Sequence, residues 1–124
     1  MLASKAIGTS TVNSWNLEGI SPCDPDGMAF YDGTLYSCFS VQDIPFDTWV
    51  HFAIGYDGAS KYAYVNGELR LNVATTTITF TANDIFIGAD QSDTLATSHY
   101  LGPLDDIRIY DRLLSAAEIA ALAN

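Results

Sequence analysis

The chain has 124 residues, and its 5 basic and 15 acidic side chains give a formal net charge of −10. That length suits one domain, and a hydrophobic content of 48% excludes an intrinsically disordered chain. The acidic excess argues against a nucleic-acid partner, and no apolar run approaches the roughly 20 residues that a membrane-spanning helix needs. We therefore expect a single domain over residues 1–124, with no nucleic-acid partner and no membrane insertion.

Turn signals divide the chain into short segments. Asp-Gly occurs at 26–27, 32–33 and 57–58, and Asn-Gly occurs at 66–67. These dipeptides favour the positive φ values of two-residue hairpin turns. The runs between them predict strands at Trp15–Ile20, Met28–Tyr31, Leu35–Val41, Trp49–Tyr56, Lys61–Val65, Glu68–Val73, Ile85–Gly88 and Leu104–Tyr110, with a further short strand at Thr76–Phe80. Long loops are expected at Ser21–Gly27 and Asp90–Tyr100.

A helix is predicted only at the carboxyl end. Ser115 and Glu118 have capping-box spacing, and Ile119 and Leu122 fall three residues apart on one helical face. Many short strands followed by one short helix predict an all-β fold, an antiparallel two-sheet β-sandwich.

The two cysteines, Cys23 and Cys38, are 15 residues apart, which fits no zinc-binding spacing. They form a single disulfide if the chain is exported, or remain two buried or half-buried thiols. Of these two alternatives we favour the free thiols.

Two segments of the chain resemble laminin G-like domains of the concanavalin A-like lectin/glucanase superfamily. The first is Trp49–Gly58, followed by the Tyr-Val-Asn-Gly hairpin at 64–67. The second is Ile87-Gly88, a loop, and then Gly102–Ile119, which is similar to the closing strand and short helix of that family. The resemblance implies a jelly-roll sandwich. It also implies that this chain lacks the first strands of the family, since those precede a position like Ser4-Lys5.

The resemblance and the alternation of apolar residues together predict one core. Trp15 is also expected to be buried, because it opens a strand with Leu17. The side chains expected in the core are Trp49, Phe52, Ile54, Val65, Ile87, Ile107 and Ile109.

A sandwich without its first strands leaves a sheet edge unpaired. Three arrangements resolve this: Met1–Val12 folds back over the gap, a second copy pairs with the edge, or another part of a larger protein completes it. Of the three we favour the homodimer.

The carboxylates do not suggest an enzyme. Glycoside hydrolases need two carboxylates facing each other across a sugar, but Glu18, Glu68 and Glu118 are far apart in sequence. Asp24 and Asp26 are two residues apart but flank a proline in a predicted turn. We therefore expect no catalytic activity.

Asp105 and Asp106 are the candidate metal ligands, because the resemblance implies Ca²⁺ bound by aspartates at the rim of the sandwich. The alternative for Asp105 is a carboxylate that accepts backbone N–H groups, and the alternative for Asp106 is an ion pair with Arg108. Asp90 and Asp93 lie in an acidic loop that either holds a hard cation or is simply solvated.

Aromatic side chains provide candidate ligand contacts, because sugar rings stack on their faces. Four candidates are Tyr62 and Tyr64, which share a strand face, and His99 and Tyr100, at a loop end. Tyr31 and Tyr36 also lie next to predicted loops.

The resemblance implies a non-catalytic recognition module that binds a glycan or a protein. The alternative is a structural or assembly domain of a larger surface protein, without a ligand of its own. In both cases the resemblance implies a secreted or cell-surface location, although Met1–Lys5 has no apolar stretch typical of a signal peptide.

Overall fold

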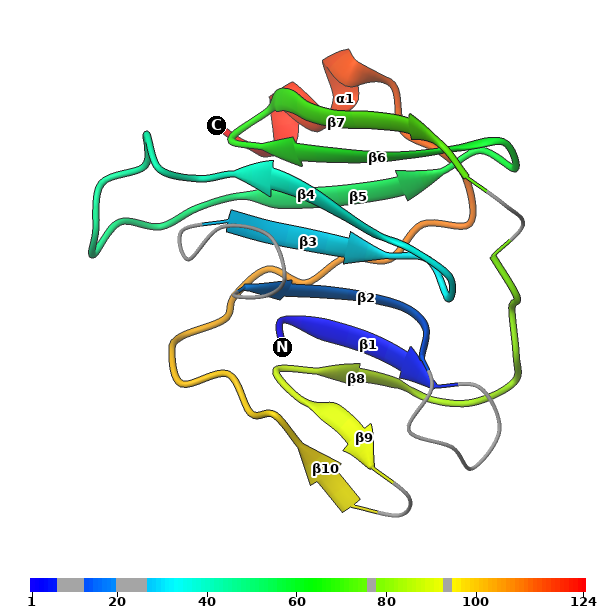
Figure 1. Ribbon diagram of the computed structural model, residues 1–124. Coiled ribbons are helices and arrows are strands. Elements are labelled where there is room, and N and C mark those ends of the chain that lie inside the picture. Colours follow the sequence, from blue (N-terminus) through cyan, green and yellow to red (C-terminus); the bar gives the residue numbers. More distant parts are fainter. Residues whose placement is uncertain (7–12, 20–26, 76–77, 93–94) are drawn as a thin grey trace.

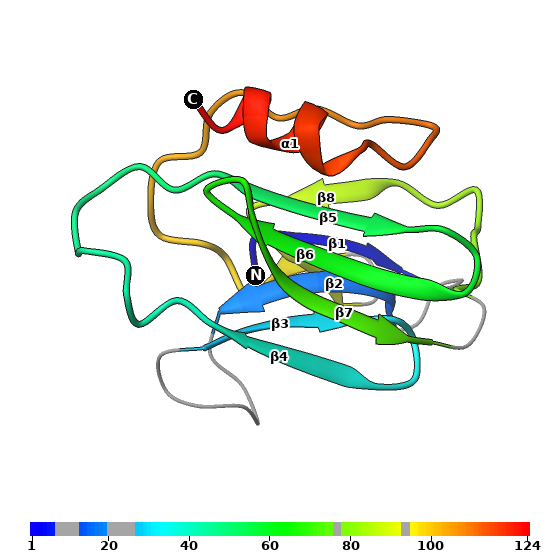
Figure 2. The same ribbon diagram turned by 90° about the horizontal axis from the view of Figure 1, so that it is seen from above.

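The computed structural model shows an antiparallel β-sandwich with one short helix at the carboxyl end, as the sequence predicts (Figure 1). The structure describes residues 1–6, 13–19, 27–75, 78–92 and 95–124. Figure 1 shows the smaller sheet above the larger one, and Figure 2 shows α1 beside the sheets, on the side where β5 and β8 run.

The larger sheet has the strand order β4-β3-β2-β1-β8, and the smaller sheet has the order β5-β6-β7. A separate hairpin joins β9 and β10. The elements are β1 (Ala3–Ala6), β2 (Asn13–Gly19), β3 (Gly27–Tyr31), β4 (Tyr36–Ser40), β5 (Phe52–Tyr56), β6 (Ser60–Val65), β7 (Glu68–Ala74), β8 (Ile85–Ile87), β9 (Asp90–Ser92), β10 (Leu95–Thr97) and α1 (Ala116–Leu122).

The β6–β7 hairpin confirms the clearest turn signal in the sequence. Asn66 and Gly67 have φ values of 49° and 82°, and Val65 pairs with Glu68 across the turn. Both central residues therefore have positive φ, as a type I′ turn requires, which explains the Asn-Gly dipeptide at this place.

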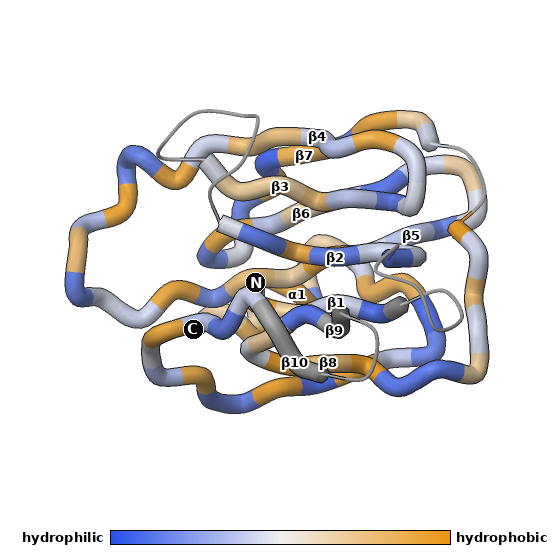
Figure 3. Tube along the Cα trace, turned by 60° about the horizontal axis from the view of Figure 1, so that its bottom comes forward, coloured by the Kyte–Doolittle hydropathy of each residue, from blue (hydrophilic) through white to orange (hydrophobic). Residues whose placement is uncertain are grey.

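The core lies between the two sheets. Alternate residues of β2, β3 and β4 point toward β6 and β7, so one face of each strand is apolar. Figure 3 shows hydrophobic positions along these strands, and also in the loop between β4 and β5, which projects from the sandwich. The buried cluster consists of Leu17, Met28, Phe30, Phe39, Ala63, Val65, Leu71 and Ile78.

Only part of the predicted core is confirmed. Val65 is fully buried, and Trp15, Phe52 and Ile54 are partly buried against the core. The prediction is wrong for the remaining four residues, which are exposed: Trp49 (69%), Ile87 (41%), Ile107 (54%) and Ile109 (69%). None of the four lies on a central strand of a sheet. Trp49 is in the loop before β5, Ile87 is on the edge strand β8, and Ile107 and Ile109 are in the segment that precedes α1.

The predicted strand Leu104–Tyr110 is not formed, and this is the largest error of the sequence reading. Asp106 has φ 50°, which interrupts the extended backbone that a strand needs. No backbone-to-backbone hydrogen bond joins residues 104–110 to another described residue. Likewise, β5 begins at Phe52 rather than at Trp49.

The amino-terminal residues fold back into the larger sheet. Strand β1 lies between β2 and β8, where Ser4 pairs with Asn16 on one side and with Phe86 on the other. This confirms the fold-back arrangement for Ala3–Ala6, while residues 7–12 lie outside the described part. The sequence analysis missed β1, and it expected a loop where β9 and β10 occur. In the Thr76–Phe80 segment, residues 78–80 are not a strand and 76–77 are not described.

Helix α1 begins with the predicted capping box. The Glu118 backbone N–H donates to Ser115 Oγ at 3.3 Å, and the Ser115 backbone N–H donates to Glu118 Oε2 at 2.8 Å. Ile119 is buried, and Ala120 lies against Gly67 in the β6–β7 turn. Within the described ranges, no helix is long and apolar enough to cross a membrane.

The cysteine interpretation needs a correction. Cys38, on β4, is disulfide-bonded, so the expectation of a free thiol is wrong for this residue. Cys23 lies outside the described residues.

A buried lysine joins the two sheets. Lys61 on β6 is 1% exposed, and its ammonium donates to Asp32 Oδ2 at 2.7 Å, to Leu35 O at 2.8 Å and to Phe30 O at 3.1 Å. It also lies 5.5 Å from the centre of the Phe30 ring, within the range of a cation–π interaction. All three ammonium protons therefore have acceptors at the end of the β3–β4 hairpin.

Asp32 is satisfied from several sides as well. Its Oδ1 accepts the backbone N–H groups of Thr34 and Leu35 at 3.0 and 2.8 Å, and its Oδ2 accepts from Lys61 and from the Thr75 hydroxyl. Burial by itself raises the pKa of Asp32, but the hydrogen bonds from Lys61, Thr75 and two backbone N–H groups outweigh burial and lower the pKa to about 2. The pair is therefore an ion pair with complete hydrogen bonding, a structural joint between the sheets.

Candidate functional site

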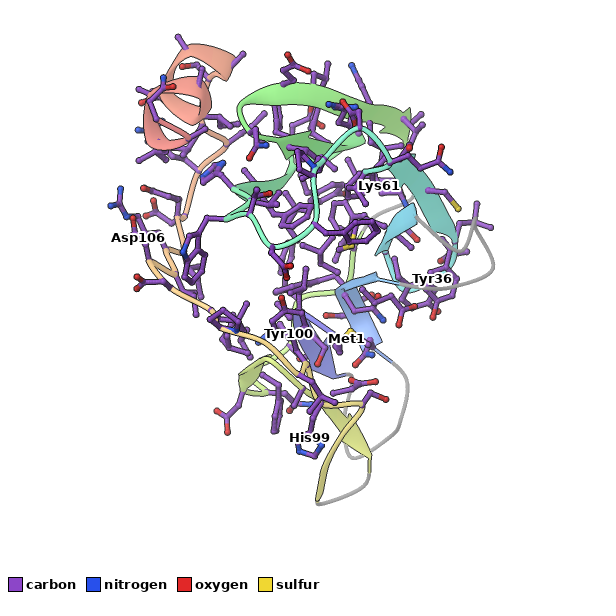
Figure 4. All side chains as sticks on the ribbon, turned by 90° about the vertical axis from the view of Figure 1, so that its left-hand side faces the viewer. Met1, Tyr36, Lys61, His99, Tyr100 and Asp106 are labelled. Atoms are coloured by element: carbon purple, nitrogen blue, oxygen red, sulfur yellow. The ribbon has the colours of Figure 1, made fainter. Side chains whose placement is uncertain are left out.

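The four predicted ligand-binding residues lie on two separate parts of the molecule. Tyr62 and Tyr64 are on β6 in the smaller sheet, where the Tyr62 hydroxyl donates to Asp57 Oδ2 at 2.6 Å and Tyr64 is buried. His99 and Tyr100 follow β10, and the Tyr100 backbone N–H donates to Gly88 O at 2.7 Å, beside the larger sheet. Figure 4 shows His99 and Tyr100 together on this segment. The structure does not bring the two pairs into one site.

The predicted metal ligands are both exposed on the segment before α1. Both carboxylate oxygens of Asp106 accept from the Arg108 guanidinium at 2.8 Å, and Asp105 Oδ1 accepts the Asp106 backbone N–H at 2.8 Å. The described residues contain no group of three acidic, histidine or cysteine side chains that could hold a metal ion. Asp105 and Asp106 by themselves therefore do not make up the oxygen-rich shell of Ca²⁺, and calcium binding here stays an expectation of the family resemblance alone.

A polar row crosses the outward face of the larger sheet. Ser4 pairs with Asn16, Asn16 with Tyr31, and Tyr31 with Tyr36, so these four residues stand side by side on β1, β2, β3 and β4. Directly opposed residues on antiparallel strands point to the same face. Glu18, two residues after Asn16, lies on this face as well.

The two tyrosines at the end of the row are stacked. The ring centres of Tyr31 and Tyr36 are 4.6 Å apart, with an angle of 31° between the ring planes. Tyr36 is exposed, whereas Tyr31 is half-buried. This stack offers a rigid aromatic surface at the edge strand β4.

Asn16 is the unusual member of the row. Its side chain is 2% exposed, and its Oδ1 has no hydrogen-bond partner. Its amide instead hydrogen-bonds Tyr36, which in turn hydrogen-bonds Glu18. A buried acceptor without a partner costs free energy, and most buried polar atoms in proteins are satisfied. We call Asn16, Glu18, Tyr31 and Tyr36 the Asn16 cluster.

The two titratable groups of the Asn16 cluster are shifted in the same direction. Burial raises the pKa of Glu18, and this outweighs the opposing effects of the Tyr36 hydrogen bond and the amino terminus. Burial also raises the pKa of Tyr36, helped by the negative charge of Glu18. Tyr36 therefore stays a neutral hydroxyl at physiological pH, while Glu18 ionises at a higher pH than an ordinary glutamate does.

The Asn16 cluster combines an aromatic surface, a carboxylate and an unpaired carbonyl acceptor. Such a set suits a ligand with an apolar face and several hydroxyl donors. The sequence analysis missed Asn16 and Glu18 as site residues. A signal was present, since Ser14, Asn16 and Glu18 alternate with the core residues Trp15 and Leu17 along one strand.

Comparisons with known proteins define the class of fold. The profile of a laminin G-like family, described as the concanavalin A-like lectin/glucanases superfamily, matches residues 8–120. The chain belongs to this family. The resemblance read from the sequence is thereby confirmed, and with it the sandwich fold.

One solved structure is similar over most of the chain. It is the crystal structure of residues 221–444 of an S-layer domain-containing protein from Clostridium thermocellum, with 28% identity and a TM-score of 0.52. The similarity covers 79% of this chain and 52% of that one, so the chain spans about half of its relative. No curated protein matches in sequence.

Proposed function

We propose that this chain is a non-catalytic recognition module that binds carbohydrate through the Asn16 cluster. The observation that carries the proposal is the buried Asn16 Oδ1 without a partner, beside the stacked rings of Tyr31 and Tyr36. A sugar hydroxyl that displaces the groups burying Asn16 Oδ1 and donates to it, with the apolar face of the sugar against Tyr36, supplies the missing hydrogen bond. The Glu18 carboxylate accepts a second hydroxyl.

The negative charge of the chain indicates which class of carbohydrate the site would bind. A net charge of −10, together with a carboxylate in the cluster, repels sulfated and sialylated glycans. The proposed ligand is therefore a neutral glycan. Glu18 is the one carboxylate among the four residues of the cluster, and the charge of Asp90 also acts on it.

A glycan array carrying neutral, sialylated and sulfated glycans tests the proposal. We expect binding of neutral glycans, and a loss of at least tenfold in affinity, about 1.4 kcal/mol, in Tyr36→Ala and in Asn16→Leu. Tyr62→Phe is the matched control, because it removes a tyrosine hydroxyl on the other sheet and is expected to bind like the wild type. Binding lost in Tyr62→Phe but kept in Asn16→Leu would move the site to β6. The absence of binding to every glycan on the array would contradict carbohydrate recognition.

The alternative function is an assembly domain of a surface protein. The similarity to an S-layer domain-containing protein favours this function and supports a cell-surface location for this chain. Self-association without any binding on the array would favour assembly over recognition.

A further inference from the structure

The segment Leu104–Tyr110 has the composition of a strand but none of its pairing. Figures 1 and 2 show this part of the chain (orange) running along the outside of the sandwich, past the edge strands β5 and β8. Leu104 lies against Gly88 after β8, and Leu113 lies against Gly55 on β5. The segment therefore lies at the open side of both sheets, and it makes no backbone-to-backbone hydrogen bond with another described residue.

The side chains of this segment are unusually exposed for their type. Exposure reaches 54% at Ile107 and 69% at Ile109, and Leu104 and Tyr110 are also exposed. Asp106 and Arg108 form an ion pair within the segment, with 66% and 49% of their side chains exposed, and Arg108 also hydrogen-bonds Tyr110. Exposed apolar residues next to an unpaired backbone mark an interaction surface.

We infer that Leu104–Tyr110 pairs antiparallel with the same segment of a second copy of this chain, about a two-fold axis at Ile107. In this register Ile107 faces Ile107 of the other copy, and Leu104 faces Tyr110. Asp106 faces Arg108 of the other copy, and Arg108 faces Asp106. The Asp106–Arg108 ion pair within each chain is thereby replaced by two Asp106–Arg108 ion pairs between the two chains. Residues of opposite charge that face each other across two strands stabilise the pairing of those strands.

The neighbouring symmetric registers are disfavoured by the same charges. An axis at Asp106 places two aspartates opposite each other, and an axis at Arg108 places two arginines opposite each other. Like charges directly opposed are destabilising. The sequence Asp-Ile-Arg at 106–108 is thus complementary to itself only about Ile107.

Pairing also changes the backbone at Asp106. Its φ of 50° lies in the left-handed region, which is uncommon for a residue other than glycine. A cross-strand partner gives Asp106 and its neighbours backbone hydrogen bonds that favour the extended conformation instead. The single-chain fold therefore holds this residue in the left-handed region, which the paired state releases.

Charge-reversal variants test the inference by sedimentation velocity at high micromolar concentration and 150 mM NaCl, roughly the physiological ionic strength that screens the net charge. The wild type is expected to dimerise. Asp106→Arg and Arg108→Asp are each expected to weaken self-association at least tenfold, because each places like charges opposite each other. A mixture of the two single variants is expected to form a heterodimer, and the double exchange is expected to restore the homodimer.

This design separates specific pairing from general repulsion and from misfolding. Asp106→Arg reduces the negative net charge from −10 to −8. If repulsion between the net charges of two chains controlled association, this variant would associate more strongly, whereas the inference predicts that it associates more weakly. Recovery in the mixture shows that each single variant is folded, and circular dichroism checks this directly. A monomeric wild type overturns the inference. A dimer unaffected by both single variants also overturns it.

Discussion

Two polar clusters in this sandwich differ in how completely their hydrogen-bonding groups are satisfied. Between the sheets, the ammonium of Lys61 has three acceptors and the carboxylate of Asp32 has four donors. On the outward face of the larger sheet, Asn16 is as deeply buried as Lys61 but leaves its carbonyl oxygen without a partner. A fully satisfied buried network holds a fold together, whereas we propose that the unsatisfied acceptor beside an aromatic surface takes part in ligand binding.

The two clusters also differ in how their carboxylates titrate. Hydrogen bonds that outweigh burial lower the pKa of Asp32, and burial raises the pKa of Glu18. The difference arises from the number of donors that each carboxylate accepts. The comparison therefore predicts large effects on stability at the Lys61–Asp32 joint and effects on binding at the Asn16 cluster.

The largest effect is expected from Asp32→Ala, which leaves the Lys61 ammonium buried without its counter-charge. Breaking a buried ion pair in this way costs about 3–5 kcal/mol of the free energy of unfolding. Lys61→Met is the matched variant and is expected to cost less, since Asp32 keeps its donors from Thr34, Leu35 and Thr75. Urea denaturation at pH 7 measures both. An equal loss of unfolding free energy in the two variants would contradict the idea that the unpaired, buried Lys61 ammonium causes most of the destabilisation.

The pH dependence of stability follows from the lowered pKa of Asp32. Its folded-state pKa of about 2 lies below the unfolded value of 3.8, so its contribution is complete above pH 4 and is lost as the pH falls toward 2. That difference corresponds to about 2 kcal/mol. Urea denaturation between pH 6 and pH 2.5 is expected to show the loss, and Asp32→Asn is expected to show a flatter profile. An unchanged profile in Asp32→Asn would assign acid sensitivity to other carboxylates.

Asn16→Leu is expected to change stability by less than about 1 kcal/mol, because the lost hydrogen bond to Tyr36 is offset by removal of an unsatisfied carbonyl. Thermal denaturation measures this change in the same preparation that is tested for glycan binding. A large loss of stability would show that Asn16 is a structural residue like Lys61, and the contrast between the clusters would fail.

The smallest effect is expected for calcium. Because the Asp106 oxygens accept from Arg108 and no third acidic ligand is near among the described residues, millimolar Ca²⁺ is expected to leave the melting temperature unchanged. Asp105→Asn provides the control. A rise in the wild type that disappears in Asp105→Asn would establish the calcium site that the family resemblance implies.

The candidate site could be predicted only in part from the sequence. The tyrosines at 31 and 36 were visible beside loops, but their stacking depends on the β3–β4 register. Asn16 and Glu18 alternate with core residues, and this alternation places them on the outer face of a strand. It does not show which residues of the neighbouring strand pair with them. The burial of Asn16 depends on the packing of the neighbouring strands. The lack of a hydrogen-bond partner for its Oδ1 likewise cannot be predicted from the sequence of one strand.

Local signals determined the elements whose causes are local. The Asn66-Gly67 turn and the Ser115–Glu118 capping box formed as predicted, because φ preferences and i to i+3 hydrogen bonds act within a few residues. The tertiary structure alone decided the elements that depend on distant partners. Strand β1 exists because β2 and β8 pair with it, and Leu104–Tyr110 stays outside the sheets despite its strand-like sequence because no described strand pairs with it. The joint at Lys61 likewise required two sheets to meet, since the residues that satisfy its charge lie about 30 positions earlier in the chain.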